Sequence, residues 1–433
     1  MAQYRNAIVI VALTAFALAC GEADDDDTGS TSTAPSGVPP VALEVAARQT
    51  PNADPSTAGH AIAAFGADLF SAARSLTPIP GNVTVSPASV AVALAMVEPG
   101  AVGDAQAQLR ALLRIDDPQA FHASMNALER NLEARVPEPF NEGDDPGEIT
   151  ARIANAAYLQ QGYPFRADYL EAVGTNYGPV LHEVDFMSDP DAVAHEINTF
   201  VADATNERIT DLVGDGVIKP ETVLALVNAL YLKASWLQTF EHGDTVDDTF
   251  TNLEGDALSV PMMHGHSDSS ARGDGWIGAT KQYVGGLSAQ FILPDDGRFD
   301  DIAANLPDVF AEYDANRTSG AELAMPRFET RFNTELSAAL GKLGLTGPFV
   351  EGGLLGIADD PRLVIDQVIH ETFVAMDEEG TEAAAATVVL MFPTSGPLLP
   401  PVPVTLDRPF LYRIIDDQTG AVLFIGQIVD PTE

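Results

Sequence analysis

The spacing of apolar residues predicts helices in the first third of the chain and strands in much of the rest. Alanine and leucine recur at helical spacing, with caps such as Ser86 before Pro87, in four segments: residues 57–75, 86–98, 104–114 and 118–135. Strand-like alternation or apolar runs mark residues 223–231, 287–293 and 363–376, and a pair of segments near the C-terminus. Helices followed by strands that can pair antiparallel predict an α+β fold.

One stretch combines helical composition with a strand-like pattern. Residues 378–387, EEGTEAAAAT, contain four consecutive alanines, which favour a helix. The flanking residues 363–376 and 388–392 are strand-like, however, and prolines from Pro393 onward interrupt any helix. On a period of two, one face of this stretch is small and uncharged while the other carries Glu382. The face consists of Thr381, Ala383, Ala385, Thr387, Val389 and Met391.

This stretch, the loop after it and the segments at residues 407–415 and 420–426 resemble the hinge, reactive loop and C-terminal strands of the serpins. Other matching segments follow in family order at residues 82–90, 155–159, 197–206, 226–236, 260–263 and 325–328. The resemblance covers roughly residues 57–431. It implies the serpin fold, with a large mixed or antiparallel main sheet, about eight to nine helices, smaller sheets and an exposed reactive loop.

The resemblance also implies roles for individual residues. The hinge, which starts insertion of the reactive loop, would comprise Glu378, Glu379, Gly380, Thr381, Glu382, Ala383, Ala384, Ala385, Ala386 and Thr387. The shutter, a polar cluster beneath the main sheet, would comprise Ser86, Ser89, Asn228 and His370, and the breach, at its top, Trp236, Arg327 and Glu378. Taken one at a time, these residues have simpler interpretations. Ser86 could be a helix cap and nothing more, and Trp236 could be an ordinary core residue.

The family pattern places the cleaved bond about sixteen residues after the first hinge acid, which gives Thr394 and Ser395. Pro393 supports this position because it keeps the preceding backbone extended. A small β-branched residue at the bond suits elastase-like or subtilisin-like proteases. Cleavage after Phe392 or Leu390 is the alternative and would suit chymotrypsin-like proteases.

The function implied by the resemblance is inhibition of serine proteases, with cysteine proteases as a further class. The protease would cleave the loop, become trapped as a covalent acyl-enzyme, and be displaced as the loop inserts into the main sheet. The chain would be no enzyme, would have no catalytic residues and would need no cofactor. A non-inhibitory serpin that acts as a binding or structural protein is the alternative. His264 and His266 beside Asp268 could hold a metal, but loop histidines are more often surface residues, so no metal is expected.

The N-terminus has the pattern of an export signal. Arg5 precedes an apolar run over residues 7–19, which is too short to span a bilayer, and Cys20 follows as the only cysteine. We therefore expect a signal peptide at residues 1–19 and a lipid on Cys20, with an ordinary signal and a free thiol as the alternative. Residues 20–56 contain four consecutive aspartates with Ser, Thr and Pro, which predicts a disordered tether. Residues 57–433 would form a single serpin domain with its reactive loop at about 378–405.

The charge of the chain restricts its partners. It has 63 acidic and 22 basic residues, a net charge of −41, so nucleic acids and anionic membrane surfaces are disfavoured. This acidity serves solubility or adaptation to a saline habitat. The expected partner is a target serine protease, held in a covalent complex by a monomer. Membrane contact would occur only through the lipid anchor, in the cell envelope at the outer membrane or cell surface, and without the lipid the protein would be extracellular.

Overall fold

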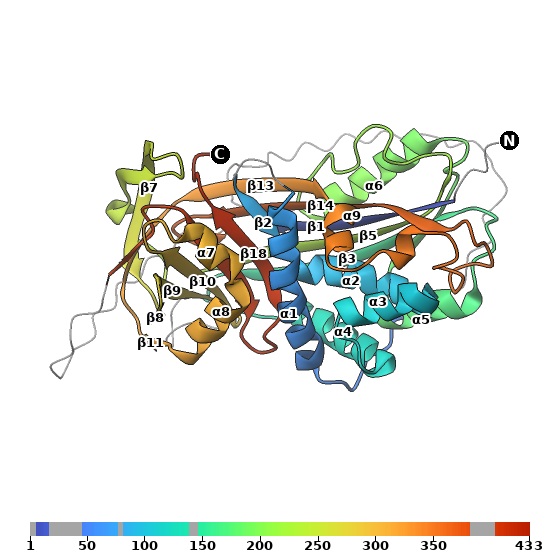
Figure 1. The fold of residues 1–433 in the computed structure, drawn as a ribbon, viewed down its shortest axis with the longest axis horizontal. Coiled ribbons are helices and arrows are strands. Elements are labelled where there is room, and N and C mark those ends of the chain that lie inside the picture. Colours follow the sequence, from blue (N-terminus) through green and yellow to red (C-terminus); the bar gives the residue numbers. More distant parts are fainter. Residues whose placement is uncertain (1–5, 17–45, 77–80, 138–145, 382–402) are drawn as a thin grey trace.

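The computed structural model describes residues 6–16, 46–76, 81–137, 146–381 and 403–433. In these residues helices and strands form one mixed assembly of three sheets, with helices on both faces of the largest sheet (Figure 1). The α+β class predicted from the sequence is therefore confirmed.

The four helices predicted in the first third of the chain are present, each ending within two residues of its predicted limits. Four helices of the described chain begin alike, with an Asp or Ser side chain that accepts a backbone hydrogen bond and a proline in the first turn. The α-helices of the described residues are α1 (Pro55–Arg74), α2 (Pro87–Val97), α3 (Gly103–Leu112), α4 (Pro118–Glu133), α5 (Ala167–Tyr177), α6 (Pro190–Ala204), α7 (Phe299–Ala304), α8 (Leu306–Ala315) and α9 (Ser337–Lys342). Three short 3-10 helices are η1 (Glu98–Gly100), η2 (His242–Asp244) and η3 (Gly347–Phe349).

The main sheet has seven strands and is covered on both faces. Its order is β13 (Phe328–Glu335), β14 (Val364–Met376), β1 (Ala7–Phe16), β5 (Thr222–Ser235), β3 (Ile149–Gln160) and β4 (Val180–Val184), with β15 (Gly380–Thr381) also paired to β5. Helices α2 and α4 pack on one face and α6 on the other. This double cover explains why β5 is buried along nearly its whole length and has the continuous apolar sequence TVLALVNALYLKAS.

Strand β1 lies in the segment that the sequence predicts to be a signal peptide. With this segment attached, the apolar run forms a strand between β14 and β5, parallel to both (Figure 1). Ile8, Val9, Ile10 and Val11 are fully buried. A continuous apolar run suits a strand with two covered faces, so the sequence of residues 7–16 is compatible with a signal core and with a central strand. We name the strip of sheet between β5 and β14 the central position.

The predicted tether also ends earlier than expected. Residues 46–54 lie against the body, where the Arg48 guanidinium bonds the carboxylate of Glu129 at 2.8 Å and the side-chain oxygen of Asn126 at 2.9 Å. The backbone of Gln49 adds a hydrogen bond to Thr175 of α5. Helix α1 begins at Pro55, so the segment that precedes it is anchored to α4 and α5.

Two further sheets, one of seven strands and one of four, complete the described fold. The second sheet has the order β11 (Thr318–Ser319), β8 (Ser269–Gly273), β9 (Trp276–Tyr283), β10 (Leu287–Pro294), β17 (Phe410–Asp416), β18 (Val422–Ile428) and β2 (Val83–Val85). The third has the order β16 (Val404–Thr405), β12 (Glu322–Pro326), β7 (Ala257–His266) and β6 (Val246–Thr251). The strands predicted at residues 287–293 and at the C-terminus are thus β10, β17 and β18.

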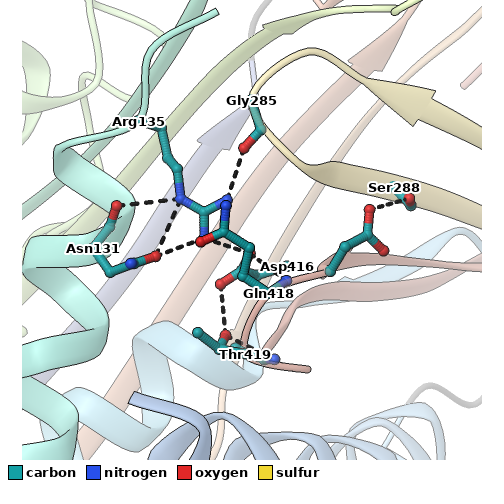
Figure 2. Close-up of polar contacts among 9 residues, drawn as sticks. Asn131, Arg135, Gly285, Ser288, Asp416, Gln418 and Thr419 are labelled. Atoms are coloured by element: carbon teal, nitrogen blue, oxygen red, sulfur yellow. Dashed lines mark hydrogen bonds and ion pairs between the residues drawn. The ribbon is translucent and has the colours of Figure 1, made fainter. Parts of the chain in front are cut away.

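A buried ion pair joins the helical part to the second sheet. Figure 2 shows Arg135, just beyond α4, donating to the carboxylate of Asp416 at 2.6 Å and to the backbone oxygen of Gly285 at 2.7 Å. Thr419 donates to the other oxygen of Asp416, which is completely buried. One guanidinium therefore ties the β9–β10 and β17–β18 turns to the end of α4, so a buried charge is paired and its hydrogen bonds are satisfied.

Candidate functional site

The predicted hinge begins with a tight turn at the top of the main sheet. Beyond β14 the chain turns through residues 377–379, and Gly380 and Thr381 then pair antiparallel with Ser235 and Ala234 of β5. The carboxylate of Asp377 accepts hydrogen bonds from the backbone of Glu379 at 3.0 Å and of Gly380 at 3.2 Å. Burial raises the pKa of Asp377 to about 6. Asp377 was not singled out from the sequence, although an Asp before a Glu-Glu-Gly turn is a recognisable turn signal.

The turn conformation requires a glycine at position 380. Gly380 has φ of +128°, and an added Cβ would lie 2.4 Å from the backbone oxygen of Ala234 and 2.6 Å from the backbone nitrogen of Trp236. Only glycine reaches this backbone region without strain, and no other residue fits so close to a neighbouring strand. The hinge glycine is therefore explained by the close approach of β15 to β5.

The predicted breach residues lie together around this turn. The Glu378 side chain is 1% exposed, and its Oε1 accepts hydrogen bonds from Arg327 and from Thr245, both at 2.6 Å. Burial alone would raise the pKa of Glu378, but these two bonds hold it below its ordinary value. The ion pair fixes the turn to the strip between β12 and β13, where Arg327 lies.

Trp236 holds the other side of the turn. Its indole N–H donates to the backbone oxygen of Asp377 at 2.9 Å, and its backbone N–H donates to that of Glu379 at 2.8 Å. The ring stacks on Tyr283 with centroids 4.0 Å apart. Lys281 lies beneath, with its ammonium 4.2 Å from the ring centroid of Phe240, and burial lowers the pKa of this lysine to about 8.

The four predicted shutter residues form a connected cluster at the middle of the main sheet. Ser86 caps α2 by accepting the backbone N–H of Ser89 at 3.2 Å, and its own backbone N–H donates to Nε2 of His370 at 3.0 Å. The hydroxyl of Ser89 donates to Asn228 at 2.5 Å. All four side chains are at most 1% exposed. Ser86 is thus a helix cap and a member of the cluster at once.

Sequence reasoning did not extend this cluster far enough. The Asn228 side chain also donates to Asn155 at 2.7 Å, and Asn155 donates to the carboxylate of Glu129 at 3.1 Å. Burial, partly opposed by Arg48, raises the pKa of Glu129 to about 7. A buried polar chain therefore runs from the N-terminal segment at Arg48 through α4 and β3 to the shutter. Asn155 stood inside a matched motif, but nothing in the sequence indicated its partner Glu129.

Several predicted site residues lie outside the described residues. They are Cys20, the hinge residues from Glu382 to Thr387, and Thr394 and Ser395 of the predicted cleaved bond. Along the described parts of the chain, no helix is both long and apolar enough to cross a membrane.

The fold and the grouped hinge, breach and shutter residues define the class of the protein. The serpin (serine protease inhibitor) family matches residues 60–431, so the chain belongs to the serpin family.

Sequence relatives and solved structures agree with this assignment. An uncharacterised serpin-like protein of Thermococcus kodakarensis is 32% identical over 381 residues, 86% of each chain. Leukocyte elastase inhibitor A of Mus musculus is 31% identical over 387 residues, covering 85% of this chain and 97% of the relative. The native thermophilic serpin tengpin superimposes with a TM-score of 0.74 at 25% identity, over 89% of this chain and 97% of tengpin. Human thyroxine-binding globulin with its thyroid hormone gives a TM-score of 0.75 at 26% identity, over 88% and 100% of the two chains.

These similarities support protease inhibition as the general activity and a protease as the general partner, because the matched names include an elastase inhibitor and several antiproteinases. Members of the family are mostly protease inhibitors and not enzymes. These similarities do not identify the target protease, the cleaved bond or the trapping mechanism.

Proposed function

We propose that this protein inhibits serine proteases as a suicide substrate, by inserting its cleaved reactive loop into the central position of the main sheet. The supporting observation is the pairing of β15 with β5. Gly380 and Thr381 already begin an antiparallel strand on β5 at the upper end of the central position. In a chain whose central position is not filled by β1, the residues that follow could extend this strand in the same register.

Extension of that register predicts which loop side chains face the core. Ala383, Ala385, Val389 and Met391 would stand opposite Leu232, Leu230, Leu226 and Leu224 of β5, which lie on the face that α2 covers. Glu382 would stand opposite Lys233, on the other face of the sheet, where the lysine is only partly buried. The small, uncharged face found in the sequence is therefore the face that insertion would bury, and burial of a charge there would be costly.

The chemistry belongs to the protease. Its serine oxygen bonds to the carbonyl carbon of Thr394, the bond to the nitrogen of Ser395 breaks, and the protease histidine delivers the proton to the departing amine. The new ester joins the two proteins, and the fragment that begins at Ser395 is no longer bonded to the loop. Insertion then carries the attached protease along the sheet before water hydrolyses the ester.

The hinge, breach and shutter serve this movement. The Glu378–Arg327 ion pair and the Trp236 hydrogen bonds hold the turn from which insertion starts. In the described structure β1 already separates Asn228 of β5 from His370 of β14, and the two side chains are held by Ser89 and Ser86 respectively. In a chain without β1, β5 and β14 would have to part in the same way to admit the loop, and the partners of Asn228 and His370 would change. Because these side chains are buried, each must keep a hydrogen-bond partner during the exchange.

Thr394 suits elastase-like or subtilisin-like targets, with Phe392 or Leu390 as alternative sites for chymotrypsin-like enzymes. The second candidate function is binding without inhibition, since one of the similar structures is a thyroxine-binding globulin. The hinge favours inhibition because its inward residues are small and uncharged, whereas bulky or charged residues there would block insertion.

The test is a covalent complex on a denaturing gel. The chain that begins at Gly21 is incubated with pancreatic elastase and with subtilisin, and a band that contains both proteins is expected. Thr381→Arg places a charge opposite Ala234 on the buried face, so this variant is expected to be cleaved with at least a tenfold loss of complex. Glu382→Arg is the matched control on the other face and should retain the complex. Cleavage without any complex, or equal complex from both variants, contradicts insertion.

We also propose export across the inner membrane and lipid attachment at Cys20, which would hold the inhibitor in the cell envelope on a tether of residues 21–45. The support is the Arg5, apolar run and Cys20 pattern in the sequence. Intact mass of the exported protein tests it, with a diacylglyceryl group on Cys20 expected and an unmodified cysteine contradicting it. Cys20→Ser is the control and should release the protein from the envelope.

A further inference from the structure

In the chain that carries residues 7–16, strand β1 occupies the central position. It pairs with β14 along residues 7–15 and with β5 along residues 7–16, so it is bonded on both edges. Ile8 and Ile10 pack into the core beneath α2, and Val9 and Val11 pack into the core beneath α6. This is a fully integrated central strand.

Strands β1 and β15 follow one another along the same edge of β5. Phe16, the last residue of β1, pairs with Leu232, and Thr381, the last residue of β15, pairs with Ala234. The direction of β15 is opposite to that of β1. Any residue that continued β15 beyond position 382 would therefore meet the end of β1.

Register gives the extent of this overlap. Continued along β5, residues 383–391 would pair with Leu232 down to Leu224, the same positions that Phe16 down to Ile8 already hold. Val389 would replace Ile10 opposite Leu226, and Met391 would replace Ile8 opposite Leu224. At the level of the shutter, Ala12 is paired with both Asn228 and His370, where Thr387 would stand.

We propose that the central position is a binding site for the chain's own N-terminal segment, residues 7–16, and that this segment competes with the reactive loop for it. A precursor that folds with the segment attached is then a substrate of proteases and not an inhibitor, and inhibition requires a chain without the segment. This inference rests on the proposed insertion mechanism. It adds that residues 7–16 regulate insertion by blocking the central position. β1 runs parallel to β5, whereas the inserted loop would run antiparallel to it. Competition therefore does not require the two segments to run in the same direction, only that β1 be apolar and about as long as the inserted loop.

The competition is tested with chains that begin at Met1 and whose residues 7–16 either can or cannot form the central strand. The double variant Val9→Asp with Ile10→Asp puts a carboxylate into each buried face and should leave the central position free for the loop. Ala2→Asp with Gln3→Asp carries the same two charges outside β1 and is the matched control. We expect the Val9 and Ile10 double variant to form covalent complex with elastase at least tenfold faster than wild type or the control.

A second full-length variant, Ile10→Pro, removes a backbone donor from the middle of β1 without adding charge, and the same increase is expected if the double variant aggregates. Equal rates for wild-type and β1-variant chains overturn the competition while the proposed function stands, provided that the chain beginning at Gly21 forms the complex. Absence of complex from that chain and from every variant overturns the proposed function and the competition with it. Amide exchange supplies an independent readout: protection of residues 7–16 in the wild-type precursor supports their place in the sheet, and unprotected amides there overturn it.

Discussion

Gly380 is the position where a single methyl group should disable the hinge. Its φ of +128° lies in a region that costs other residues of order 1–3 kcal/mol. The added Cβ would also lie 2.4 Å from the oxygen of Ala234, and this oxygen belongs to the backbone of a central strand that cannot withdraw. Alanine at position 380 therefore forces β15 away from β5.

The energetic effect can be worked from these contacts. Separation of β15 from β5 strains or breaks the backbone hydrogen bond from Trp236 to Glu379, 2.8 Å long, at a net cost of about 1 kcal/mol. Together with the backbone strain, Gly380→Ala should raise the free energy needed to begin insertion by about 2–4 kcal/mol. Because each 1.4 kcal/mol slows a step about tenfold, insertion should slow by roughly a hundredfold relative to ester hydrolysis.

The assay is the stoichiometry of inhibition, the moles of inhibitor consumed for each mole of protease trapped. We expect it to rise at least about tenfold for Gly380→Ala, with cleaved chain as the product. Gly344→Ala is the matched control, because Gly344 has φ of +92° but no atom within 4 Å of an added Cβ. An unchanged stoichiometry for Gly380→Ala, in a chain that is folded, would refute the argument that the turn starts insertion.

Two further predictions concern buried charges. Arg327→Ala leaves the carboxylate of Glu378 buried without its ionic partner, so the free energy of unfolding should fall by about 2 kcal/mol, a value reduced because the Arg327 side chain is 43% exposed. Urea unfolding measures this change, and the control Arg327→Lys should lose less. An unchanged free energy of unfolding for Arg327→Ala would contradict the pairing. Folded Glu129 keeps its proton up to about pH 7 whereas the unfolded chain releases it near 4.5, so its contribution to stability falls by up to about 3 kcal/mol as pH rises across that window. Glu129→Gln should remove this fall, and identical pH profiles of unfolding would contradict the raised pKa.

Local patterns predicted most of the elements correctly. The sequence of α1, α2, α3 and α4 was sufficient because each segment is rich in helix-forming Ala or Leu, and α1, α2 and α4 also begin with a capping side chain followed by a proline. Strands β5 and β14 were equally readable, since burial on both faces leaves continuous apolar runs. These features depend on residues close together in sequence.

Long-range pairings could not be predicted in the same way. The run at residues 7–16 is apolar enough to be a signal core or a buried strand, and periodicity alone cannot separate the two. The partner of Asn155, Glu129, lies on a helix 26 residues away, and no local signal joins them. The shutter and breach residues were grouped from the sequence only because several motifs resembled one family in the same order.

The most direct test of the account is amide exchange on the chain that begins at Gly21, before and after its reactive loop is cut. If the cut loop becomes a central strand, residues 383–391 should exchange at least about a hundredfold more slowly in the cut chain than in the intact chain, because they gain ladder hydrogen bonds between β5 and β14. Equal exchange of residues 383–391 in the two forms would contradict insertion and, with it, the proposed mechanism of inhibition.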